Sequence, residues 1–263
     1  MIGVFDSGIG GLTVVRRLLE VLPEYRVTYF GDTARVPYGN KSVETVTRYA
    51  FEDSEFLLRQ GAKLIVVACN TASAVALDAL RERLQVPVIG VIEPAVRAAV
   101  AASASGRIGV IGTRATIASG IYERTIAAMR PEATVVAEPA PLLVPLVEEG
   151  WLDQPETPAI LRAYLAPLLA RRVDTIILGC THYPVLRDTI ARLVGDEVAL
   201  VDSAQETAVE TRALIMRDQS LRESLERSPD HLFFVSDITP HFAEVAERFL
   251  ARRIEGRLRK ITL

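Results

Sequence analysis

The sequence predicts an α/β protein made of two pseudo-symmetric α/β domains with mainly parallel sheets and an active site in the cleft between them. First, short β-branched apolar runs alternate with segments of helical periodicity along the whole chain. Second, motifs of the first half recur about 106 residues later. Third, 263 residues exceed the usual size of a single domain. These observations together favour two similar units over one larger domain.

Nine apolar runs are predicted to be strands. They are Ile2–Phe5, Val27–Phe30, Leu64–Ala68, Val88–Val91, Ile108–Ile111, Thr134–Ala137, Thr175–Leu178, Val198–Val201 and Leu232–Val235. Because helical segments separate them, we expect parallel sheets covered by helices on both faces. In such sheets ligands gather beyond the carboxyl ends of the strands, so the functional residues are expected in the loops that follow.

The two halves carry matching strand-and-turn segments. Ile2–Ser7 resembles Ile108–Thr113, and Leu64–Asn70 resembles Thr175–Thr181. The first pair is offset by 106 residues, from position 2 to 108, and the two cysteines by 111, from 69 to 180. Similar offsets indicate that the cysteines occupy equivalent positions in two lobes. If the lobes face each other, the thiols do too.

Two connections between the domains are predicted. The small, polar segment Ala101–Gly106 is typical of a surface connection, and the crossing to the second domain is expected shortly before it. A return crossing is expected near Asp202 and Ser203, because Ser203 can cap a helix that begins at Ala204. The predicted domains are residues 1–95 with 206–263, and residues 96–205.

Composition and charge favour a cytoplasmic enzyme acting on a small molecule. The net charge of −3 gives no general attraction for nucleic acids or anionic lipids. The longest uncharged stretch, Leu64–Leu77, is shorter than the ~18 residues of a membrane span, and the N-terminus lacks signal-peptide features. A basic cluster near the end is interpreted as a solvated helix face rather than a polyanion site. Its members are Arg252, Arg253, Arg257, Arg259 and Lys260.

Cys69 and Cys180, the only cysteines, each directly follow a predicted strand and precede a predicted helix. A helix N-terminus lowers a cysteine pKa from ~8.5 to ~3.5–7.5, which predicts reactive thiolates. The alternative is that both are small buried apolar residues. Residues with hydroxyl or amide side chains follow both cysteines. Such polar groups need hydrogen-bond partners when they are buried in an apolar core, so a functional pair is favoured.

Metal and dinucleotide sites are weaker interpretations. No close cysteine or histidine ligand spacing involves His182, His231 or His241, so no metal is expected. The glycine-rich turn starting at Gly8 has Thr13 in place of the third glycine of a dinucleotide fingerprint. The same turn still offers backbone N–H groups to a substrate carboxylate.

Four motifs appear in order along the chain: Phe5–Gly11, Pro37–Gly39, Ala68–Ser73 and Gly179–Pro184. With these motifs the chain resembles glutamate racemases of the aspartate/glutamate racemase family. Aspartate racemases typically carry Glu after the second Cys-Thr, where this sequence has His182. The resemblance therefore favours glutamate over aspartate as the substrate.

The resemblance implies roles for individual residues. Cys69 and Cys180 are the acid/base thiols, acting on D-glutamate and L-glutamate respectively. Asp6, His182 and Glu148 assist them, with Glu149 as the alternative to Glu148. The implied substrate-binding residues are Asp6, Ser7, Tyr38, Gly39, Asn70, Thr71, Thr113, Thr116, Thr181 and His182.

A two-base mechanism without a cofactor follows, since inverting Cα requires proton removal from one face and delivery to the other. None of Lys41, Lys63 and Lys260 lies at a strand-end motif, which disfavours pyridoxal phosphate. The resemblance also implies a role in supplying D-glutamate for peptidoglycan, and a homodimer is the commonest assembly. Rival interpretations are an amino-acid-binding module, and thiol redox or hydrolase chemistry at Cys180 with His182.

Overall fold

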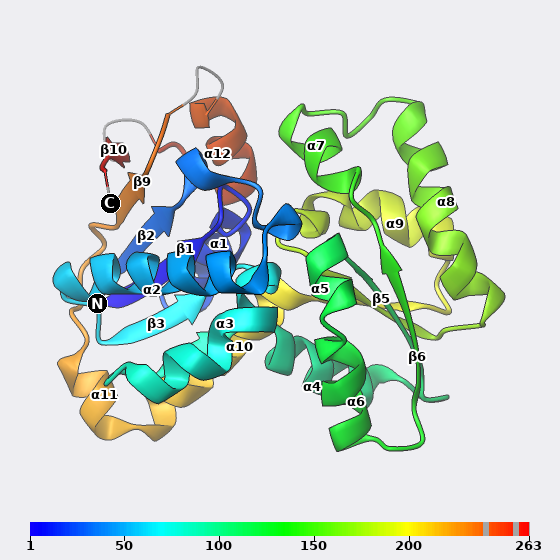
Figure 1. Ribbon diagram of the computed structural model, residues 1–263, viewed down its shortest axis with the longest axis horizontal. Helices are drawn as coiled ribbons and strands as arrows, with labels where there is room; N and C mark the ends of the chain where they lie inside the picture. The colour runs from blue at the N-terminus through cyan, green and yellow to red at the C-terminus, as the bar shows by residue number, and fades with distance from the viewer. Residues whose placement is uncertain (239–241, 255–257, 263) are drawn as a thin grey trace.

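The computed structural model describes residues 1–238, 242–254 and 258–262. Two separate parallel sheets lie side by side, each with its own helices (Figure 1). His241 and Arg257, which entered the sequence analysis, lie outside the described residues. The predicted α/β class with two similar halves is confirmed.

The first sheet has six strands in the order β10-β9-β2-β1-β3-β4, all paired in parallel. The strands are β1 (Ile2–Asp6), β2 (Val27–Gly31), β3 (Leu64–Val67), β4 (Val88–Gly90), β9 (Leu232–Val235) and β10 (Leu258–Lys260). The central strands are fully buried, as expected of a sheet covered on both faces.

The second sheet has four strands in the order β6-β5-β7-β8, again all parallel. They are β5 (Arg107–Gly112), β6 (Thr134–Pro139), β7 (Thr175–Gly179) and β8 (Ala199–Asp202). This order repeats β2-β1-β3-β4 of the first sheet, so the repeat seen in the sequence is a repeat of topology. All nine predicted strands are present, and β10 is an addition.

Helices cover the sheets and connect the strands (Figure 1). They are α1 (Leu12–Val21), α2 (Val43–Arg59), α3 (Asn70–Arg83), α4 (Ile92–Ala102), α5 (Arg114–Ala118), α6 (Ile121–Met129), α7 (Leu143–Glu148), α8 (Glu156–Ala170), α9 (Arg187–Val194), α10 (Ser203–Arg217), α11 (Gln219–Ser224) and α12 (Phe242–Leu250). Short 3₁₀ turns are η1 (Thr33–Arg35), η2 (Tyr38–Asn40) and η3 (Tyr183–Leu186). No helix of the described ranges has both the length and the apolar character needed to cross a membrane.

Two local predictions need correction. Asp202, not Ser203, caps α10: Asp202 Oδ1 accepts from the backbone N–H of Ala204 at 2.9 Å, while Ser203 Oγ donates to the Leu178 carbonyl. A carboxylate at the end of β8 reaches the helix better than the buried hydroxyl beside it. The second correction concerns the first connection, because α4 continues to Ala102 and shortens the predicted surface segment.

The basic cluster is not one helix face, in contrast to the interpretation of the sequence. Arg252 and Arg253 are exposed residues beyond the end of α12, while Arg259 and Lys260 are exposed on strand β10. Strand β10 is at the edge of its sheet, where charged side chains discourage pairing with another chain.

Helices α4 and α10, which connect the two sheets, pack against each other. The exact domain boundaries stay a prediction.

Candidate active site

A cavity of about 240 Å³ lies where the carboxyl ends of the two sheets face each other. Its walls come from both halves of the chain, since turns after β1 and β3 meet turns after β5 and β7. Cys69 and Cys180 both line this one cavity. The parallel topology explains the meeting, because in each sheet the cysteine-bearing strand is the direct neighbour of the first strand of its half.

Cys69 is the N-cap of α3. The Cys69 sulfur accepts a hydrogen bond from the backbone N–H of Ala72 at 3.5 Å. Its S–H group donates to the Ser7 hydroxyl, with 3.5 Å between Sγ and Oγ. Burial, followed by the negative charge of Asp6, raises the pKa of Cys69 to about 12 despite the helix N-terminus. The predicted lowering of this pKa is therefore wrong, because desolvation outweighs the helix dipole when the thiol is almost fully buried.

Cys180 lies directly after β7 in a different local setting. The chain turns through Thr181 and His182 into the short η3, and α9 begins only at Arg187. The expectation that a helix starts at this cysteine is thus wrong, because the chain enters a short 3₁₀ turn that begins at Tyr183 and has Pro184 as its second residue. The Cys180 sulfur therefore contacts a side chain: it lies 3.7 Å from Nδ1 of His182.

His182 connects Cys180 to Glu148. The His182 Nε2 atom lies 2.9 Å from Glu148 Oε1, so the ring is held between the sulfur and a carboxylate. Burial lowers the His182 pKa, but the hydrogen bonds with Cys180 and Glu148 outweigh it and raise the pKa to about 10. The ring of Phe249 from α12 packs edge-on against the imidazole at 5.2 Å. At neutral pH this arrangement favours an imidazolium beside Cys180.

Asp6, at the end of β1, is almost fully buried at the cavity wall. Its Oδ2 atom accepts from the backbone N–H of Gly8 at 3.0 Å. Burial raises the pKa of Asp6, whereas the charge of His182 and the backbone N–H groups of the turn lower it. Asp6 therefore couples electrostatically to both thiols, through His182 on one side and directly with Cys69 on the other.

Asn70 offers an unused hydrogen-bond donor. Its Oδ1 atom accepts from the Tyr122 hydroxyl at 2.7 Å, but Asn70 Nδ2 has no partner among the described residues although it is buried. A buried N–H group without a partner costs free energy unless a ligand accepts from it. Because Asn70 lines the cavity, its amide is suited to bind a carboxylate oxygen.

Three threonine hydroxyls connect the halves. Thr71 Oγ1 from α3 lies 3.0 Å from Thr113 Oγ1 and 3.4 Å from Thr116 Oγ1, both at the start of α5. Thr113 also caps α5 through the backbone N–H of Thr116. Thr71 and Thr113 line the cavity, while Thr116 is fully buried behind Thr113.

The remaining predicted site residues also lie at the cavity. Ser7, Tyr38, Gly39 and Thr181 are among its lining residues. The hydroxyl of Tyr38, however, is hydrogen-bonded to buried carboxyl groups rather than directed to a substrate. Glu148 lines the cavity and Glu149 is exposed, so the geometry favours the first of the two acids.

The glycine-rich turn contacts the opposite half instead of cradling a dinucleotide. A Cβ atom on Gly10 would lie 2.4 Å from both His182 Nδ1 and Thr181 Oγ1. Thr13 donates to the Thr181 carbonyl at 3.0 Å, which explains a threonine at this position. Among the described residues, no three potential ligands gather as a metal site.

Two functional contributions escaped sequence reasoning. Tyr122 orients Asn70 from a distance of 52 residues in sequence, and no motif signals it. Val36 and Asn40 line the cavity on either side of the Pro37–Gly39 motif, so their proximity to that motif was the only available signal.

Sequence comparisons match the chain to racemases. A family model described as Asp/Glu/Hydantoin racemase matches residues 2–211. A glutamate racemase of Geobacter metallireducens is 51% identical over 253 residues, which cover 96% of this chain and 93% of the relative.

Solved structures of glutamate racemases share the whole fold. A Bacillus anthracis isoform superposes with a TM-score of 0.93 at 40% identity, covering 100% of this chain and 97% of the other. A Francisella tularensis enzyme in complex with D-glutamate gives a TM-score of 0.90 at 36% identity, with coverages of 99% and 97%.

Proposed function

The chain belongs to the Asp/Glu/hydantoin racemase family, and we propose that it interconverts L-glutamate and D-glutamate with two cysteine thiols. The observation that carries the proposal is that Cys69 and Cys180, from equivalent strand ends of two sheets, line one cavity. The names of the similar proteins support glutamate as the substrate.

The reaction moves a proton across Cα. One sulfur enters as a thiolate and removes the Cα proton, while the other enters as a thiol and delivers its proton to the opposite face. The raised pKa of Cys69 favours its thiol form, whereas an imidazolium at His182, with Nδ1 3.7 Å from the Cys180 sulfur, stabilises the negative charge that Cys180 carries when it acts as the base. We therefore assign proton removal from L-glutamate to Cys180, the thiol that the family resemblance implies for this enantiomer.

The reverse direction requires a thiolate at Cys69. The negative charge of Asp6 is one cause of the raised Cys69 pKa. A substrate ammonium group near Asp6 offsets that charge and so eases ionisation of Cys69. The substrate itself thus helps to prepare the second base.

No cofactor takes part in the proposed reaction. The developing carbanion is stabilised by hydrogen bonds to the α-carboxylate and by exclusion of water from the cavity. Asn70 Nδ2 is the donor best prepared for that carboxylate, because it is buried and lacks another partner among the described residues. Ser7, Thr71 and Thr181 add hydroxyl groups around it.

Deuterium incorporation tests the proposal. The protein is incubated with each enantiomer of glutamate in D₂O, and optical rotation and Cα deuteration are followed. We expect both signals in the wild type and a loss of about 10²–10⁴-fold in the Cys69→Ser and Cys180→Ser variants. Undiminished racemisation in either variant would disprove the two-thiol mechanism.

Rival functions give different outcomes in the same assay. An aspartate racemase would exchange the Cα proton of aspartate faster than that of glutamate. An amino-acid-binding module would bind glutamate, measured by calorimetry, without any isotope exchange. A cysteine hydrolase would accumulate an acyl-enzyme with an electrophilic ester.

The proposed cellular role is to supply D-glutamate for peptidoglycan in the cytoplasm, with the chain acting as a homodimer. Depletion of the protein in its host should then create a requirement for added D-glutamate. Light scattering should give twice the mass of 28.8 kDa for the purified protein.

A further inference from the structure

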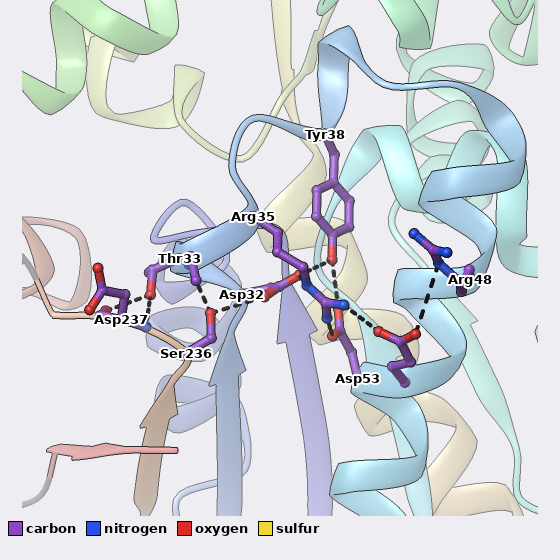
Figure 2. Close-up of polar contacts among 10 residues, drawn as sticks. Asp32, Thr33, Arg35, Tyr38, Arg48, Asp53, Ser236 and Asp237 are labelled. Atoms are coloured by element: carbon purple, nitrogen blue, oxygen red, sulfur yellow. Dashed lines mark hydrogen bonds and ion pairs between the residues drawn. The ribbon is translucent and has the colours of Figure 1, made fainter. Parts of the chain in front are cut away.

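A buried pair of carboxyl groups lies beneath the loop of residues 33–40, outside the reaction centre. Asp32 follows β2 and Asp53 lies on α2 (Figure 2). Both side chains are fully buried. Isolated buried carboxylates are costly, so a cluster of this kind needs a reason.

Tyr38 lies between the two carboxyl groups. Its hydroxyl is 2.5 Å from Asp32 Oδ2 and 3.0 Å from Asp53 Oδ2. A tyrosine hydroxyl has one proton, so it can donate to only one of them and must accept from the other. One carboxyl group is therefore protonated and the other is charged.

The donors around the pair assign the charge to Asp32. Asp32 Oδ2 accepts from Arg35 Nε at 2.6 Å, and Asp32 Oδ1 accepts from Ser236 Oγ at 2.9 Å, in addition to the Tyr38 bond. Asp53 is contacted by Arg35 Nη2 at 3.1 Å, but Arg35 also pairs with Glu52. Burial and the charge of Asp32 raise the pKa of Asp53 well above its ordinary value, which agrees with a neutral acid there.

The cluster holds the loop from below, and strand β9 holds it from the side. The backbone N–H of Ala34 donates to Ser236 Oγ at 2.8 Å, and Thr33 Oγ1 donates to the Asp237 carbonyl (Figure 2). Ser236 and Asp237 directly follow β9, one of the two strands that the four-stranded sheet lacks.

The far side of the loop forms the cavity wall. Val36, Pro37, Tyr38, Gly39 and Asn40 all line the cavity. Gly39 also lies close to the opposite half, because a Cβ atom there would be 3.2 Å from Thr113 Cβ. Movement of the loop would therefore change the cavity without moving either cysteine.

We propose that Asp32 is the charged positioning residue of this loop, with Asp53 as its neutral partner, and that they set glutamate affinity by fixing Tyr38. The proposal rests on the proposed racemase function. It assigns substrate binding to residues that do not touch the reacting atoms, and it distinguishes two aspartates that differ little in burial.

Matched Asp→Asn substitutions test the assignment. Asp32→Asn removes the charge that Arg35 and Tyr38 need, so KM should rise about tenfold for both enantiomers with a much smaller change in kcat. Asp53→Asn keeps a neutral donor to Tyr38 and an acceptor for Arg35, so its KM should stay within about twofold of the wild type. Asp202→Asn, a buried carboxylate that caps α10 away from the cavity, is the control with unchanged KM.

Tyr38→Phe keeps both carboxyl groups and should raise KM about threefold, which keeps the test decisive if Asp32→Asn does not fold. Thermal unfolding is measured for every variant, because a purely structural role would lower the melting temperature without separating KM from kcat. An equal rise in KM for both Asp→Asn variants, or no rise for Asp32→Asn and Tyr38→Phe, would overturn the proposal. Absence of glutamate racemisation by the wild-type protein would instead refute the proposed function.

Discussion

The two halves place their cysteines alike and surround them differently. Cys69 caps α3 and contacts a backbone N–H group and the Ser7 hydroxyl, whereas Cys180 contacts the side chain of His182, which pairs with Glu148. The order of strands β2-β1-β3-β4 is repeated by β6-β5-β7-β8, so the sheet fixes where each sulfur lies. The residues of the turn after each strand then determine which polar or charged groups contact the sulfur.

This difference cannot favour one product. Enantiomers have equal free energies in water, so the equilibrium constant is one and kcat/KM must be equal in both directions. A difference between the two thiols therefore changes the rates of the individual proton-transfer steps, but not the equilibrium constant. A primary isotope effect for each enantiomer is the measurement that separates the halves.

The largest expected effect comes from removing the imidazole. His182→Asn deletes the cation beside Cys180, so kcat/KM should fall about 10²-fold in both directions. If Cys180 acts on L-glutamate, the isotope effect with 2-deuterated L-glutamate should increase more than that with the D-enantiomer. An equal increase for both enantiomers would contradict the division of labour between the thiols.

A smaller effect is expected from replacing Asn70, whose buried Nδ2 donor has no partner among the described residues. Asn70→Asp replaces Nδ2 with an oxygen that repels a carboxylate, so KM should rise by more than about tenfold. Tyr122→Phe removes only the hydroxyl that orients Asn70 and should raise KM by a few-fold. Steady-state kinetics would decide, and unchanged KM in Asn70→Asp would exclude Asn70 from carboxylate binding.

Neutralising the carboxylate on the Cys180 side should act through His182. Glu148→Gln removes one cause of the raised His182 pKa, so the alkaline limb of the activity profile should move to lower pH. The fall in kcat/KM at neutral pH should be about fivefold, since Glu148 is partly exposed to solvent. Glu149→Gln, the exposed neighbour, is the matched control and should leave the pH profile in place.

The smallest effect concerns stability at high pH. The thiol of Cys69 ionises near pH 9 in the unfolded chain but only near 12 in the folded protein, so its contribution to stability is complete below pH 9 and decreases above it. Cys69→Ala abolishes this dependence. Relative to the wild type, the variant should gain about 1 kcal/mol between pH 8 and pH 10, measured by thermal or urea unfolding. A difference that stays constant over this range would show that Cys69 titrates normally.

Local patterns predicted the strands and the cysteine turns because both depend on neighbouring residues. Strand β10 was missed because Leu258–Lys260 contains two charged residues, and pairing with β9 makes it a strand. The Cys69 turn behaves as predicted geometrically, but its pKa does not, since burial is a property of the assembled cavity. His182 and Glu148 are 34 residues apart, so only the fold brings them together.

The Asp32 and Asp53 pair shows the same limit. Each aspartate is unremarkable in its own segment, and the network also needs Ser236, 204 residues away from Asp32. Contacts of this range depend on the β2–β9 pairing, which the sequence pattern alone does not specify.

The threonine hydroxyls between the halves have a consequence for product release. Two of these contacts cross between the halves, from Thr71 to Thr113 and from Thr71 to Thr116; either oxygen can be the donor in each, and water can replace either partner. Separating the halves at this point exchanges hydroxyl contacts for hydration at little net free energy. These hydroxyl contacts therefore contribute little to the free energy that holds the halves together, and they would oppose product release only weakly.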